Sequence, residues 1–221
     1  DGASDCTYFE GLPGTPVDIK DDLGELSTQA CVVFRKTQML WMPAAGPKRA
    51  LVRATRPVPG SAPPAAGTLD LGAADLEASW LGEFRREVVP FPAPAGQPEA
   101  LKEVLRLRKD VEIRQLGKPL RIKGHSISIV RDAQSGQVER LEGHGDVLVR
   151  SGDMQAKGES LTANLRYGPD GTLLQNTIVV WNVPEEGLKS VVWQGRSAVR
   201  SARFVIDALH NDFQAYGGVV A

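Results

Sequence analysis

Apolar and polar residues alternate with a period of two over most of the chain after residue 105. The alternation is clear in 126–129 (SISI), 161–166 (LTANLR) and 203–207 (RFVID), whereas 177–181 (TIVVW) and 191–193 (VVW) are more continuously apolar. Because successive side chains of a strand point to opposite faces, this pattern predicts short strands with one buried face. Turn-forming sequences at 133–137, 168–171, 182–187 and 208–212 separate the runs. This spacing predicts an antiparallel sandwich, roll or barrel.

Two segments are ambiguous between helix and strand. Residues 69–84 fit one short helix around 73–80 or two short strands, since Asp75 and Glu77 interrupt the apolar positions. In 98–117 the first residues suit a helix start, whereas the alternation from Leu105 onward suits a strand. We therefore expect a short helix or turn there that gives way to a strand.

The strand pattern repeats along the chain. Units that begin at Lys123, Lys157 and Arg200 share a small-residue turn, an alternating strand, a glycine-containing loop and a valine strand, with steps of 34 and 43 residues. The strands that begin at Asp110 and Asp146 are 36 residues apart. Such units cannot bury their apolar faces alone, so stacking would give one continuous interior. Rungs of about 20–25 residues are usual in a parallel β-helix, so that fold matches these steps poorly.

Proline is concentrated in one part of the chain, and neither charge nor hydropathy indicates a nucleic-acid-binding or membrane-spanning protein. Ten of the fifteen prolines lie in 43–98, which predicts loops or edge extensions there. We expect a divergent N-terminal region over 1–70 that joins the same sheet system, and repeats over 71–221, with a weaker copy at 72–89. The net charge of −1 comes with no basic cluster for nucleic acid, and no apolar run approaches the roughly 20 residues that span a bilayer.

The two cysteines, Cys6 and Cys31, have no metal-site spacing and no nearby histidine. The simplest hypothesis is a disulfide between them, which suits an oxidising compartment and contributes roughly 3 kcal/mol for a loop of about 25 residues. The alternative is two free buried thiols in a cytosolic protein.

No residue pattern indicates catalysis. His125, His144 and His210 lie in predicted turns without metal-ligand spacing, Ser160 belongs to a predicted turn, and no G-x-S-x-G occurs. We therefore expect a protein that is not an enzyme and that has neither a metal nor a cofactor. Trp181 and Trp193, on either side of the loop at 182–187, suit either a core or a ligand groove.

One pattern within residues 105–221 consists of the motif Gly145-Asp146-Val147, the segment 156–163, Tyr167 and Gly171, and 199–207 with 217–219 match it again. With this pattern, residues 105–221 resemble the OstA-like domain of the lipopolysaccharide-transport family. The family includes a periplasmic bridge protein, a protein anchored in the inner membrane and the N-terminal region of an outer-membrane protein. The proline-rich segment and the cysteines are not part of the pattern.

The resemblance implies a long, twisted antiparallel β-jellyroll, or β-taco, that is open along one side and at both ends. It implies a periplasmic scaffold, with or without an anchor outside this sequence, that binds lipopolysaccharide or a related lipid in an apolar groove. Edge strands would pair with neighbouring jellyrolls or, head to tail, with further copies. The alternation selects twelve groove residues: Val111, Ile113, Ile127, Ile129, Val147, Val149, Leu161, Ala163, Val179, Trp181, Phe204 and Ile206. The alternative is a closed β-sandwich that binds protein or glycan at the cell surface.

Overall fold

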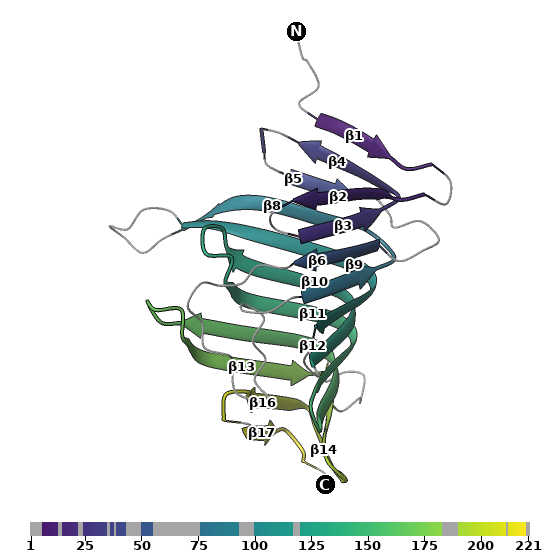
Figure 1. Cartoon of the computed structure of the whole chain (residues 1–221). Coiled ribbons are helices and arrows are strands. Elements are labelled where there is room, and N and C mark those ends of the chain that lie inside the picture. Colours follow the sequence, from purple (N-terminus) through teal and green to yellow (C-terminus); the bar gives the residue numbers. More distant parts are fainter. Residues whose placement is uncertain are drawn as a thin grey trace.

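Every regular element that the computed structural model describes is a β-strand, which confirms the all-β prediction. The structure describes residues 6–12, 15–21, 24–34, 36–37, 39–42, 50–54, 76–92, 100–116, 120–182, 190–210 and 212–219. The strands are β1 (Cys6–Glu10), β2 (Val17–Asp21), β3 (Gly24–Thr28), β4 (Ala30–Phe34), β5 (Met39–Met42), β6 (Ala50–Ala54), β7 (Leu76–Trp80), β8 (Phe84–Phe91), β9 (Ala100–Gln115), β10 (Leu120–Asp132), β11 (Val138–Ser151), β12 (Met154–Tyr167), β13 (Leu173–Trp181), β14 (Ser190–Gln194), β15 (Ser197–Ser201), β16 (Arg203–Asp207) and β17 (Asp212–Tyr216). They form one antiparallel sheet, stacked along the long axis of the molecule with β1 at one end and β17 at the other (Figure 1).

The sheet is folded lengthwise because its longest strands bend near their middle. The first half of β9 pairs with β8 and its second half with β7, and the two halves of β12 pair with β13 and β14. The shorter strands follow the same path with a break, so that β7 and β8, or β15 and β16, together span both layers. Figure 1 shows the bend as the curved right-hand side of β9 to β12. The result is a sheet folded like a taco, as the sequence predicted.

We name the two layers the long arm and the short arm. The long arm consists of β1, β4, β5, β8, residues 100–108 of β9, 126–132 of β10, 138–144 of β11, 160–167 of β12, β13, β16 and β17. The short arm consists of β2, β3, β6, β7, residues 111–115, 120–123, 147–151 and 154–157 of the same long strands, β14 and β15. The N-terminal strands β1 to β6 therefore belong to the same sheet as the repeats.

The line between the arms, which we call the crease, is formed by residues 109–110, 124–125, 145–146 and 158–159. Glycine permits the bend in three of the four strands. Gly145 has a φ of +75°, and a Cβ added there would lie 2.6 Å from the Cβ of His125. A Cβ on Gly158 would lie 2.6 Å from Val180 Cγ1. The close contacts at both positions, and the left-handed backbone at Gly145, explain why these two positions require glycine.

The interior between the arms is filled with apolar side chains from both layers. Leu107, Ile127 and Leu141 of the long arm are at most 2% exposed. Val111 and Val147 of the short arm are fully buried. Side chains on one face of an open sheet would remain accessible, so this burial shows that the two arms pack against each other. Facing sheets pack about 10 Å apart with interdigitating side chains, as in a sandwich core.

Several local predictions are wrong. Ala100–Gln115 is a single strand, so the expected helix or turn before Leu105 does not form. For 69–84 the strand alternative is confirmed over residues 76–80, and 69–75 lie outside the described residues. The expected turns around Gly124 and Gly158 are bends within continuous strands, because these glycines change the direction of the chain without reversing it. The predicted turns at 133–137 and 168–171 are confirmed as hairpin loops.

The predicted disulfide between Cys6 and Cys31 is also wrong. Both thiols are free, with Cys6 exposed and Cys31 buried. Cys31 pairs with Phe9 across β1 and β4, whereas Cys6 pairs with Phe34. The two cysteines are thus offset by three positions, about 10 Å along a strand, and a disulfide requires Cα atoms within about 7 Å.

Candidate functional site

The folded sheet places ten of the twelve predicted groove residues on the interior face, each at most 6% exposed. They are Val111, Ile113, Ile127, Ile129, Val147, Val149, Leu161, Ala163, Phe204 and Ile206. Val179 and Trp181 do not belong to this set, because they are only half-buried and alternate with the fully buried Ile178 and Val180. Ile178 pairs with Ile206, and Val180 with Phe204, which fixes the face of β13. The sequence prediction chose the wrong buried face for β13, because residues 178–181 are all apolar and show no alternation.

The two ends of the interior carry apolar side chains that are not covered. At one end Phe9 shares the inner face with the core residue Cys31 and is 42% exposed. At the other end Phe213 of β17 packs edge-on against Phe204, with ring centroids 5.9 Å apart, and is only half-buried. Within the described residues, β1 and β17 each pair on one side only. Each end therefore combines unpaired backbone groups with accessible interior side chains.

The inner face of the long arm carries three charged residues among its apolar ones. Glu103 lies two positions from Leu105 on β9 and is 4% exposed. Its carboxylate accepts hydrogen bonds from Nε of Arg86 on β8 and from Nε of Arg131 on β10. Burial alone would raise the pKa of Glu103, but the hydrogen bonds and charges of Arg131 and Arg86 hold it below its ordinary value. We call these three residues the inner triad.

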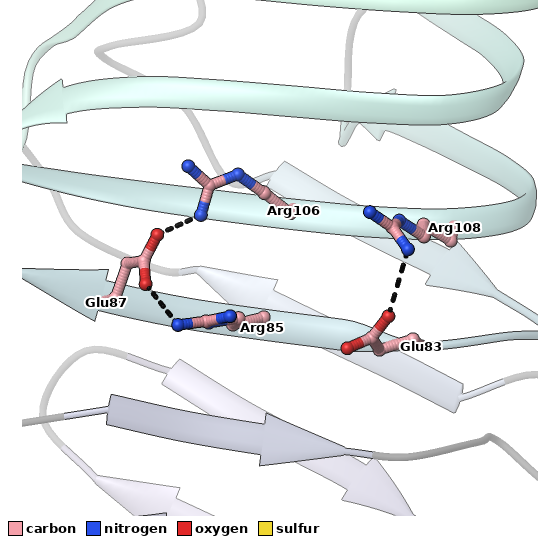
Figure 2. Close-up of a pocket in the computed structure, with 5 residues that line it drawn as sticks. All are labelled: Glu83, Arg85, Glu87, Arg106 and Arg108. Carbon is pink, nitrogen blue, oxygen red and sulfur yellow. Dashed lines mark hydrogen bonds and ion pairs between the residues drawn. The ribbon is translucent and has the colours of Figure 1, made fainter.

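The outer face of the same strands carries a similar arrangement, shown in Figure 2. Glu87 binds Arg106 and, at 2.8 Å, Arg85. Arg108 lies 3.4 Å from Glu83 on the same face. These five side chains line a surface cavity of about 480 Å³ that is charged throughout. We call Arg85, Glu87 and Arg106 the outer triad.

A third charged cluster lies on the outer face of the short arm. Glu112 is 7% exposed and receives hydrogen bonds from Arg114 and Arg121, while Lys123 Nζ lies 3.4 Å away. Burial would raise the pKa of Glu112, but the hydrogen bonds from Arg121 and Arg114 and the charge of Lys123 lower it to about 2. The ion pairs of this cluster link β9 to β10 on the outside of the molecule, and they do not face the interior.

All three histidines are exposed, and none of them belongs to the packed interior. His125 and His144 are exposed residues of β10 and β11, not turn residues as predicted. His144 Nδ1 lies 3.1 Å from Oγ of Ser160, which is a buried strand residue. His210 lies in a turn, 2.7 Å from Asp207. Among the described residues no group of three or more metal-ligating side chains is assembled.

A second surface cavity follows the outside of the crease. It has a volume of about 660 Å³ and is lined in part by His125 and by charged residues such as Lys109 and Asp110. It lies on the convex side of the bend, behind the apolar interior. Both cavities are therefore outside the space between the arms.

Comparison with known proteins identifies no relative. No family model, no curated protein and no solved structure matches the chain. In the part of the chain that the structure describes, no helix has the length and apolar character needed to cross a membrane.

The inner triad was missed by the sequence reasoning, although the sequence contains a signal for it. Arg131 continues the interior positions Ile127 and Ile129, and Glu103 occupies the same phase as Leu105. A charged residue in the apolar phase of a strand indicates either the end of the buried face or a paired buried charge. Here Glu103 is a paired buried charge, and its pairing with Arg86 and Arg131 is visible only in the folded structure.

Proposed function

We propose that this protein is a non-catalytic lipid-binding and transfer scaffold of the periplasm. In this proposal it accommodates the acyl chains of lipopolysaccharide or a related lipid between its two arms. It passes the lipid to a neighbouring jellyroll that pairs with an edge strand. The location and the lipid follow from the resemblance to the lipopolysaccharide-transport family.

One observation carries the proposal: the apolar interior runs along the whole folded sheet and reaches the surface at both ends. Phe9 and Phe213 are accessible at opposite ends of the stack, each on an edge strand. Moving an acyl chain from water into such an interior is favourable by about 0.8 kcal/mol per CH₂. An edge strand with unpaired backbone groups is also a template for strand addition.

Binding requires the arms to separate, because the middle of the interior is filled by the protein's own side chains. The short arm is uniformly narrow: its strands β2, β3, β6, β7, β14 and β15 have five residues each. The long arm extends further in β8, which has eight residues, and in β13, which has nine. We therefore expect lipid to enter at the ends or along the rim opposite the crease. The short arm should be the one that moves away when the arms separate.

The burial of the interior supports a second candidate, a closed β-sandwich that binds protein or glycan at the cell surface. Ile178, Val180 and Phe204 are fully buried, as in a packed core. In this alternative the outer surface is the binding surface, and the interior does no more than stabilise the fold.

Site-specific photo-crosslinking distinguishes the two candidates. Benzoylphenylalanine replaces Phe9, Ile129 or Phe213 on the inner face, and in matched variants it replaces the adjacent outward residues Tyr8, Ser128 or Gln214. The proposal expects adducts with purified lipopolysaccharide from the three inner positions and not from the outer ones. Adducts from the outer positions alone, or equal yields from both sets, would overturn it.

A further inference from the structure

The inner triad lies where an apolar wall would be expected to continue. Along β9 the inward positions pass from Leu107 through Leu105 to Glu103, and along β10 Ile127 and Ile129 lead to Arg131. Beyond Glu103 the same face resumes with Leu101, which is 52% exposed. The triad is thus a charged spot with apolar side chains on both sides along β9.

The charges of the triad do not balance. Two guanidinium groups share one carboxylate, so the group has a net charge of +1. The side chain of Glu103 is 5% exposed, whereas those of Arg86 and Arg131 are 33% and 21% exposed. Each arginine contacts the carboxylate through Nε, and within the described residues its terminal amino groups have no acceptor. The arginine side chains are therefore accessible enough to donate further hydrogen bonds.

Burying this group costs free energy that an apolar wall would not. Charges lose hydration when buried, and replacing a buried ionic triad by apolar residues is often neutral or stabilising. Arginine differs from lysine in presenting a planar fork of donors that matches carboxylate and phosphate groups. Two such forks on one face, positioned by one buried carboxylate, suit a ligand oxyanion that completes the charge balance.

We propose that Arg86 and Arg131, positioned by Glu103, bind the anionic headgroup of an amphiphile whose chain lies on the inner face of the long arm. This inference rests on the proposed function, since it assigns the headgroup end of the same lipid. The chemical class is a phosphate monoester or a carboxylate attached to an acyl or alkyl chain. Leu101 and Leu105 contact the first methylene groups on either side of the charged spot.

The outer triad provides a matched control within the same strands. Arg85 and Arg106 share Glu87 as Arg86 and Arg131 share Glu103, but they face outward beside Arg108 and Glu83 (Figure 2). Their side chains are 46% and 44% exposed, and the cavity between them is lined only by charged residues. The outer triad can attract anions, but no apolar side chain lines the cavity beside it.

The experiment compares three probes by calorimetry on the whole chain: dodecyl phosphate, dodecyl maltoside and inorganic phosphate. The inner variant carries Arg86→Gln, Glu103→Gln and Arg131→Gln together, so that no buried charge is left unpaired. The outer variant carries Arg85→Gln, Glu87→Gln and Arg106→Gln. A third variant, Glu103→Gln alone, removes the competing negative charge but keeps a side-chain oxygen that can accept hydrogen bonds from the arginines. Thermal unfolding of each variant checks that it is folded.

The wild-type chain is expected to bind dodecyl phosphate at least about tenfold more tightly than dodecyl maltoside, as one charge-assisted hydrogen bond would give. The inner variant should lose this preference with unchanged affinity for the maltoside, and the outer variant should keep it. Glu103→Gln should strengthen dodecyl phosphate binding several-fold. If the inner variant does not fold, the affinity of Glu103→Gln for dodecyl phosphate tests the headgroup site instead. A merely structural role for Glu103 predicts no gain in this affinity.

Each contrary result has a separate meaning. Equal binding of the two amphiphiles, or a preference that only the outer variant loses, overturns the headgroup site and leaves the proposed lipid-binding function intact. Inorganic phosphate that binds as tightly as dodecyl phosphate also overturns it, because the site would then recognise free phosphate. If neither amphiphile binds, the proposed function fails together with the headgroup site.

Discussion

Asp110 and Asp146 occupy equivalent positions at the crease, two strands apart on β9 and β11. Both have left-handed backbone, with φ of 51° and 49°, and each follows another residue with positive φ, Lys109 or Gly145. Non-glycine residues rarely adopt this conformation, although aspartate tolerates it better than most. The 36-residue repeat of the sequence therefore corresponds to a repeated bend, and the bends of successive strands align to fold the sheet.

Replacing Gly145 by alanine should destabilise the protein strongly. The added Cβ would lie 2.6 Å from the Cβ of His125, and the φ of +75° disfavours any L side chain. We expect a loss of about 2–4 kcal/mol in the free energy of unfolding, measured by urea denaturation.

Gly152→Ala is the control for Gly145→Ala. Gly152 also has a positive φ, of +58°, but a Cβ there would meet nothing within 4 Å. Its cost should be about 1 kcal/mol, the cost of the backbone conformation alone. Equal losses in the two variants would show that close packing at the crease contributes nothing.

The orientation of β13 can be tested with two adjacent valines. Val180→Asp places a charge in the fully buried interior beside Phe204, so it should cost more than about 3 kcal/mol or prevent folding. Val179→Asp, on the half-buried outer face, should change the free energy of unfolding by less than about 1 kcal/mol. The two losses are compared by urea denaturation, and the opposite order would restore the register predicted from the sequence.

The class of the fold was predictable because alternation with period two needs only local sequence. Ile127 and Ile129 alternate with serines, so their face was unambiguous, whereas Val179 lies between Ile178 and Val180 and the phase of its strand is set by β16. The sequence around Gly158 looks like a turn, since glycine is common both in turns and where a strand bends. Glycine is needed here because the strand packs closely against Val180, a contact that cannot be seen in the sequence.

The inner triad could not be predicted for a related reason. The sequence separation of Arg86, Glu103 and Arg131 is large, and three neighbouring strands must adopt one register before the charges meet. The cysteines depend on register in the same way. The sequence suggested a disulfide as the simplest hypothesis for two cysteines without a metal site, and the register of β1 and β4 prevents it.

The two thiols should react at different rates. Cys6 is exposed, whereas Cys31 is buried and burial raises the pKa of its thiol. In the native protein one thiol should react promptly with a disulfide reagent, and the second only after unfolding. Reductant should leave the unfolding midpoint unchanged. Two unreactive cysteines in the unfolded, unreduced protein would contradict the structure and restore the disulfide.

The cluster around Glu112 should make stability depend on pH in the acid range. The pKa of Glu112 is about 2 in the folded protein, and an unfolded glutamate has a pKa of about 4.3. A depressed folded pKa stabilises the protein above the unfolded pKa, and this contribution is lost as pH falls through the folded value. The partner Arg114 is 52% exposed, so solvent screening limits the contribution to on the order of 1–2 kcal/mol. The free energies of unfolding of the wild type and of Glu112→Gln should therefore differ most near pH 7, and the difference should decline between about pH 4 and pH 2.

Glu83→Gln, which removes an ion pair to the 65% exposed Arg108, is the control and should cost less than about 0.5 kcal/mol. A difference for Glu112→Gln that stays constant down to pH 2 would mean that its carboxylate charge does not stabilise the junction of β9 and β10.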